Sequence, residues 1–173
     1  AQSYFNQSLK IRKELNDYSG LISSYGNLGI LCYYKGDYEA AINNYLEAIK
    51  YADSTGAIRY KAYNLNNIGL IYANMKSYEQ AIEYLQKSIE IKKDIGDMKG
   101  VAAGYNNIGS IYNMLEKGDE AKIFFIKSKE TYEKIGLKHE TSTILRNLAT
   151  IEKNQENFNK AEEYITESIS IDK

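Results

Sequence analysis

Proline is absent from this chain of 173 residues, and cysteine and histidine occur once each. A proline inside a helix removes a hydrogen bond and clashes with the preceding turn, so its absence suits an unbroken series of helices. The lone Cys32 excludes an internal disulfide and a cysteine-based zinc cage. We therefore expect neither a metal centre nor a cofactor.

An excess of one charge and a long hydrophobic run are missing as well. The net charge is −1, with 22 basic and 23 acidic residues scattered along the chain. Nucleic-acid binders usually present a basic face, because contacts to phosphate dominate their affinity. No apolar run approaches the ~18–20 residues that a membrane span needs, and the first residues do not resemble a signal peptide. We expect no nucleic-acid partner and no membrane insertion by this soluble segment, with the cytoplasm favoured over the periplasm.

What the chain does have is repetition, at a fixed period of about 40 residues. Asparagine, leucine or isoleucine, and then glycine or alanine recur at 27–29, 67–69, 107–109 and 147–149. Twelve residues after each of these triplets comes an alanine: Ala41, Ala81, Ala121 and Ala161. Self-similarity at such a period is typical of a solenoid, in which each unit buries its apolar face against its neighbours.

Each repeat contains two stretches with apolar residues at helical spacing. The predicted helices lie near residues 1–15, 18–34, 37–54, 58–75, 77–94, 98–115, 118–134, 138–154 and 157–172. We refer to the helix that carries the three-residue motif beginning with Asn27, Asn67, Asn107 or Asn147 as helix A, and to the following helix as helix B. Gly29, Gly69 and Gly109, with Ala149 in the last repeat, should mark the points where A and B cross closely.

Several residues predict where helices begin and end. Ser77, followed by Gln80, has the spacing of a capping box, and Asp37 and Asn157 are the equivalent caps. Asn16, Gly56, Gly96 and Gly136 share one register and should close each helix B in the left-handed conformation. Gly118 and Asp119 come two residues later than Gly36 and Asp37, which predicts a shifted or looser turn in that repeat.

The series Leu65, Ile68-Gly69, Tyr72, Ala81, Leu85, Ser88 resembles the tetratricopeptide repeat (TPR) family, and the resemblance extends over the whole chain. The period is longer than the usual value of about 34. This long form is similar to the repeats of kinesin light chain, Pins-type adaptors, bacterial Rap and PlcR regulators, and repeat-containing sensor kinases.

The resemblance implies an all-α, right-handed superhelical solenoid of antiparallel helix pairs. We expect residues 1–173 to form a single array and to be a piece of a longer protein. Within the array, 1–20 would be helix B of a truncated repeat, 21–60, 61–100 and 101–140 full repeats, and 141–173 a nearly complete one.

The resemblance also implies that the A helices line a concave groove that binds a peptide. It places Asn27, Asn67, Asn107 and Asn147 on the groove wall, with Asn66, Asn106, Tyr63, Asn74, Asn113, Arg146 and Lys153 as further candidates. An asparagine costs about 0.6 kcal/mol against alanine inside a helix, and its carboxamide can pair with a peptide backbone. Alternatively, the asparagines hydrogen-bond to the adjacent A helix and stiffen the stack.

Arg146, Lys153 and Asn147 could together bind an acidic group of a partner, although a complete carboxylate clamp is not expected. Catalysis has little to draw on. His139 falls at the turn between the fourth and fifth repeats and is expected to be a solvated loop residue. Cys32 occupies a core position that tyrosine fills in other repeats. We therefore do not expect an enzyme.

Three functions remain open. The first is a protein–protein interaction module that binds an extended peptide or a partner helix in its groove. The second is the regulatory or sensory region of a larger signalling protein, such as a histidine kinase or a transcription regulator. The third is a scaffold that self-associates through its terminal helices, since Phe5, Leu9, Ile11 and Leu15 lie on the first one. Abundant lysine, asparagine, isoleucine and tyrosine favour a bacterial source.

Overall fold

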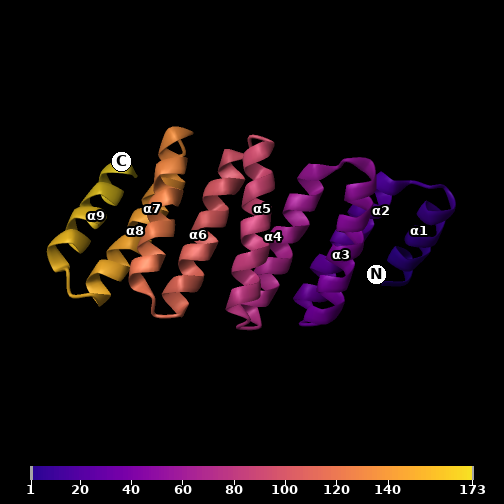
Figure 1. Cartoon of the computed structure of the whole chain (residues 1–173), viewed down its shortest axis with the longest axis horizontal. Coiled ribbons are helices and arrows are strands. Elements are labelled where there is room, and N and C mark those ends of the chain that lie inside the picture. Colours follow the sequence, from indigo (N-terminus) through magenta and orange to yellow (C-terminus); the bar gives the residue numbers. More distant parts are fainter. Residues whose placement is uncertain (1, 173) are drawn as a thin grey trace. The chain divides into compact units, whose positions relative to one another are not determined.

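The computed structural model describes residues 2–172, with side chains from residue 7 onward, and this range contains nine α-helices and no strand (Figure 1). The helices are α1 (Gln2–Glu14), α2 (Tyr18–Tyr34), α3 (Tyr38–Thr55), α4 (Ile58–Asn74), α5 (Tyr78–Asp94), α6 (Met98–Met114), α7 (Gly118–Lys134), α8 (Lys138–Asn154) and α9 (Phe158–Ile171). The predicted all-α class is confirmed. The helix bounds agree with the predicted ones to within a few residues, apart from Ala1, which lies outside the described residues.

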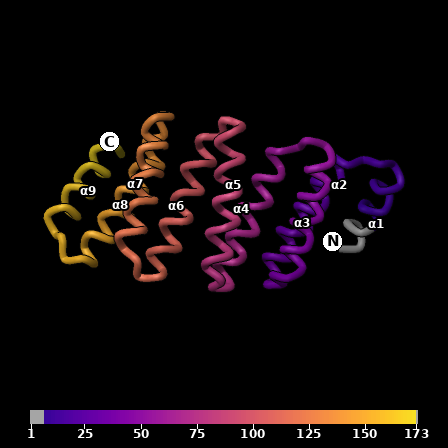
Figure 2. The backbone as a smooth tube through the Cα atoms, viewed as in Figure 1, coloured from indigo at the N-terminus to yellow at the C-terminus, as the bar shows by residue number. Residues whose placement is uncertain are grey.

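The chain divides into two compact units, Ala1–Ile91 and Lys92–Lys173, and the division falls inside α5. Within each unit, successive helices are joined by short turns and run in opposite directions (Figure 2). The A helices are α2 and α4 in the first unit and α6 and α8 in the second.

The turns share one backbone device, a residue in the left-handed conformation. Its φ is 69°, 70° and 72° at Gly56, Gly96 and Gly136, and 52° at Asn16, as the register predicted for the turns after B helices. The turns after A helices use the same device, at Gly36, Lys76, Glu116 and Glu156.

The predicted shift of the turn before α7 is wrong. Helix α7 begins at Gly118, in the same register as Tyr38 in α3, and Glu116 adopts a φ of 59° where Gly36 has 77°. A side chain is tolerated there at modest energetic cost, so the turn did not need to follow the displaced glycine.

The capping predictions are partly right. Asp37 accepts a hydrogen bond from the Ala40 N–H at 3.1 Å, as expected. Asp17 and Asp97 cap α2 and α6 in the same way, which the sequence analysis missed. Asn157 precedes α9, but its side-chain oxygen accepts no capping hydrogen bond; its Nδ2 donates to Glu152 Oε2 at 2.8 Å.

Close contact between A and B helices requires glycine at the predicted crossings. A Cβ on Gly29 would lie 2.6 Å from Tyr45 Cε1, and one on Gly69 would lie 2.8 Å from Leu85 Cγ. In the second unit, a Cβ on Gly109 would lie 2.9 Å from Phe125 Cδ1. The large side chains on the B helices are thereby buried against the backbone of the A helices.

Candidate functional site

In the first unit, α2 and α4 present a row of apolar and amide side chains, all exposed except the half-buried Asn67. We call this row the unit 1 A-surface; its residues are Asn27, Ile30, Tyr34, Tyr63, Asn67, Leu70 and Asn74. They follow one another at three- or four-residue steps along each helix, which places them on one side of it. Tyr34 is 80% exposed, Tyr63 49% and Ile30 43%. Large apolar side chains left open in this way are typical of binding surfaces.

Two asparagines of the unit 1 A-surface make contacts within the protein. The Asn74 amide donates to the Tyr33 hydroxyl at 2.9 Å and so links α4 to α2. Asn67 hydrogen-bonds to the Tyr45 hydroxyl; burial raises the pKa of Tyr45 to about 12, and this hydrogen bond acts in the opposite direction. Asn27 is exposed and the neighbouring Asn66 is half-buried. Of the predicted residues in this unit, Asn67 and Asn74 thus hydrogen-bond to neighbouring helices, and Asn27 faces solvent.

The second unit has the asparagines without the apolar neighbours. Asn147 in α8 donates to Asn106 Oδ1 in α6 at 3.1 Å, a bond between adjacent A helices. Asn107 is half-buried and Asn113 is exposed on α6. The other positions equivalent to the unit 1 A-surface are small or polar, apart from Met114: Ala103, Ser110, Thr143, Thr150 and Asn154. Hydrogen bonding, rather than apolar contact, is what this surface offers.

The two basic candidates differ in their surroundings. Arg146 donates to Ser142 Oγ at 3.1 Å and is paired with Asp172, which also accepts from Ser142 at 2.9 Å. Lys153 is exposed near the end of α8. An acidic ligand at Arg146 would therefore share the guanidinium with Asp172 or replace it.

The sequence analysis missed Glu152, a buried carboxylate in α8 that is only 1% exposed. Its register is that of Cys32, Tyr72 and Tyr112. The signal was present in the sequence, because an ionisable residue stands where the other repeats carry core residues. Lys122 lies 3.4 Å from Glu152. Burial opposes the charge of Lys122, but its contacts with Asp119 and Glu152 prevail and raise its pKa.

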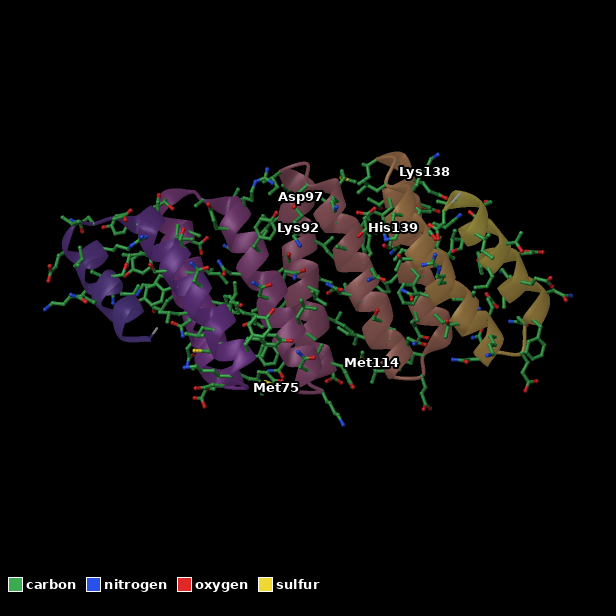
Figure 3. The ribbon with its side chains drawn as sticks, turned by 180° about the vertical axis from the view of Figure 1, so that it is seen from behind. Met75, Lys92, Asp97, Met114, Lys138 and His139 are labelled. Carbon is green, nitrogen blue, oxygen red and sulfur yellow. The ribbon has the colours of Figure 1, made fainter. Side chains whose placement is uncertain are left out.

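A second buried ionisable side chain of this unit is Lys92, which lies towards the opposite ends of the helices from Glu152. Lys92 is 4% exposed, and burial lowers its pKa although the charge of Asp97 acts in the opposite direction. Gly100 makes room for the lysine, since a Cβ there would lie 2.8 Å from Lys92 Cδ. Figure 3 shows Lys92 and Asp97 towards one end of the helices and Met114 at the opposite end of the helices.

The described residues hold no group of three or more His, Cys, Asp or Glu side chains arranged to bind a metal ion. His139 is exposed in the first turn of α8, and Cys32 is buried. Across residues 2–172, none of the helices combines the length and apolar character needed to cross a membrane.

Solved structures with a similar fold include BtubC (BKLC) from P. vanneervenii, with a TM-score of 0.86, 23% identity and 99% of this chain covered. RapI in its apo form matches with a TM-score of 0.85, 22% identity and 99% coverage. A third match is PH0952 from Pyrococcus horikoshii, with a TM-score of 0.85, 22% identity and 98% of this chain covered. PH0952 is a Signal Transduction ATPase with Numerous Domains with a tetratricopeptide repeat sensor. The chain spans 71% of BtubC, 62% of RapI and 26% of PH0952.

No curated protein matches the chain in sequence. Two family models do match, and both describe the tetratricopeptide repeat. One covers residues 1–54 and 100–173, and the other covers 62–94. Together with the helix pairs and their glycine crossings, these matches show that the chain belongs to the tetratricopeptide repeat family.

Proposed function

We propose that the chain is a protein-interaction module that binds an extended peptide or a partner helix along its A helices. The unit 1 A-surface carries this proposal, because it combines exposed tyrosine, isoleucine and leucine side chains with amides. Apolar side chains of the ligand would pack on Ile30, Tyr34 and Leu70. The Asn27 carboxamide would pair with the C=O and N–H groups of its backbone.

Within the second unit, Asn107 would make the same kind of backbone contact, and Lys153 would attract an acidic ligand residue. Asn147 could join them with the part of its carboxamide that is not bonded to Asn106. Asn66, Asn106 and Asn113 remain candidates for the same role. Because Asn74 and Asn67 already bond to Tyr33 and Tyr45, their first role is to hold neighbouring helices in place.

The test is a selection of binding peptides from a displayed library, followed by affinity measurement with fluorescence polarisation. Ile30→Lys should weaken binding of the selected peptides by about tenfold or more, because a charge replaces an apolar contact. Asn27→Ala should weaken it by several-fold through the loss of a backbone hydrogen bond.

Leu46→Lys is the matched control, since Leu46 is 41% exposed on the B helix α3 of the same unit. It should leave the affinity unchanged. Peptides that bind Ile30→Lys as tightly as the natural chain, or that are lost only with Leu46→Lys, would move the binding surface to the B helices.

A regulatory or sensory role is the second candidate. It is favoured by the fold shared with the repeat-sensor protein PH0952. In such a role a bound peptide would change the packing of the helices. Hydrogen exchange with and without a selected peptide would separate the two roles: protection confined to α2 and α4 supports a simple binding module, and changes in helices away from the peptide support a sensor.

A further inference from the structure

A cavity of about 590 Å³ lies where the beginnings of α7 and α9 meet the end of α8. Its lining residues are Lys122, Glu152, Glu156, Asn157, Phe158, Asn159 and Lys160. All of them belong to the second unit, and they stand in the turn after α8 and around it rather than along the exposed side of the A helices.

The two oxygens of the buried Glu152 carboxylate are unequally satisfied. Oε2 accepts from the Asn157 amide at 2.8 Å. Oε1 accepts no hydrogen bond from the described residues. The Lys122 ammonium, 3.4 Å away, and the Lys160 ammonium, 3.8 Å away, form ion pairs with Oε1, but neither has the geometry of a hydrogen bond. Lys122 also donates to Gln155 at 2.8 Å. A buried oxygen with ion pairs but no hydrogen bond can accept one from a ligand that brings a donor.

The first turn of α9 offers the complementary group. Its first N–H groups have no acceptor within the helix, and the Asn157 side chain makes no capping hydrogen bond to them. Helix N-termini favour acceptors. The exposed ring of Phe158 adds a flat apolar wall.

The charges of the lining select among ligands. Lys122 and Lys160 are balanced by Glu152 and Glu156, so the cavity attracts neither an anion nor a cation strongly. A neutral group with one donor and one acceptor fits best. We propose that this cavity binds an amide of a polypeptide partner, with its N–H donating to Glu152 Oε1 and its C=O accepting from the first turn of α9.

Lys160 acts as a movable cover in this arrangement. Its side chain is 56% exposed and lies over the oxygen that the ligand must reach. The site is separate from the unit 1 A-surface, so either can be correct without the other.

The test is a titration of the ¹⁵N-labelled chain with N-methylacetamide, a single peptide bond, followed by NMR. The backbone amides of Asn159 and Lys160 should show saturable shifts. Glu152→Gln should weaken binding about tenfold, because the new NH₂ would face the N–H of the ligand. Glu130→Gln, on the exposed side of α7, is the control and should bind like the natural chain.

Acetate and Lys160→Ala separate an amide site from an anion site. For an amide, acetate should bind more weakly than N-methylacetamide, and Lys160→Ala should keep or improve amide binding. Tighter binding of acetate, weaker amide binding in Lys160→Ala, equal binding in Glu152→Gln, or shifts that do not saturate would each overturn the proposal. Lys160→Ala decides the matter alone if Glu152→Gln does not fold.

Discussion

At the scale of single residues, the turns show how a backbone requirement can be met by unlike side chains. Gly36 and Glu116 occupy the same register in different repeats, and both have positive φ. Glycine reaches this conformation freely, whereas a side chain costs about 1–2 kcal/mol there. Three turns that follow A helices nevertheless have a non-glycine residue with positive φ at this position.

Replacing Glu116 with glycine should therefore stabilise the fold. We expect a gain of about 0.5 kcal/mol, because relief of the backbone exceeds the entropy that glycine adds to the unfolded chain. Urea unfolding followed by circular dichroism would measure it. Glu130→Gly, in the middle of α7, should instead cost about 1 kcal/mol. A similar loss in both variants would show that Glu116 is not strained.

Lys92 should destabilise the protein at neutral pH. Its native pKa lies below the unfolded value, so the unfolded chain binds the proton more tightly. Lys92→Met should add about 1 kcal/mol of stability at pH 7, as replacing a buried charge often does.

This advantage should shrink as pH rises from the native pKa of Lys92 towards the unfolded value near 10.5, where both states lose the proton. Melting temperatures at pH 7 and at pH 10.5 would reveal the trend. Lys134→Met changes an exposed lysine and should have almost no effect at either pH. A lower melting temperature for Lys92→Met at pH 7 would mean that the ammonium stabilises the native state.

At the scale of helices, the sequence predicted the helix crossings better than the residues that cap the helix N-termini. Gly109 lies against Phe125 because both follow the register of the repeat, which a single sequence displays directly. Asn157 was harder to predict. Its Nδ2 donates to the buried Glu152, a partner that the sequence analysis did not anticipate, and its side chain makes no capping bond.

The candidate binding residues show the same limit. The register placed asparagines on the A helices, but it could not separate those that bond to a neighbouring helix from those facing solvent. Asn147 bonds to Asn106, whereas Asn27 is exposed, although Asn147 and Asn27 hold equivalent sequence positions. That difference depends on which side chain the neighbouring helix provides.

Gly109→Ala should destabilise the α6–α7 pair by about 1 kcal/mol. Alanine favours the helix by about 1 kcal/mol, but its Cβ would overlap Phe125, and overpacking costs about 1–3 kcal/mol. Phe125→Ile should rescue part of the loss, since Ala149 and Ile165 occupy the equivalent positions in the last repeat. Thermal denaturation of both single variants and the double variant would test this. Additive losses would exclude the overlap.

At the scale of the whole molecule, helices packed only against near neighbours should unfold in parts. The chain forms two compact units, and repeat proteins distribute their stability among local interfaces. Phe125→Ala should cost about 3–4 kcal/mol and should lower hydrogen-exchange protection in α6, α7 and α8 more than in α2 and α3.

Tyr45→Ala is the matched variant in the first unit, where Tyr45 is 3% exposed. It should produce the reverse pattern, with the larger loss of protection in α2 and α3. Equal loss of protection along the chain in both variants would indicate a single cooperative unit.

The left-handed turn residues also show that the backbone repeats twice as often as the sequence does. They recur at half the spacing of the sequence repeat, from Asn16 to Glu156, so the turns after A and B helices share one backbone conformation at this position. At this position of the turn, the backbone therefore does not distinguish an A helix from a B helix; only the side chains do. A gene rearrangement that removed half a repeat would keep every remaining turn in phase, yet it would exchange the roles of the helices beyond the junction. Rearrangements by a whole repeat preserve both patterns, which makes the full repeat the smallest unit that can be gained or lost without exchanging A and B helices beyond the junction.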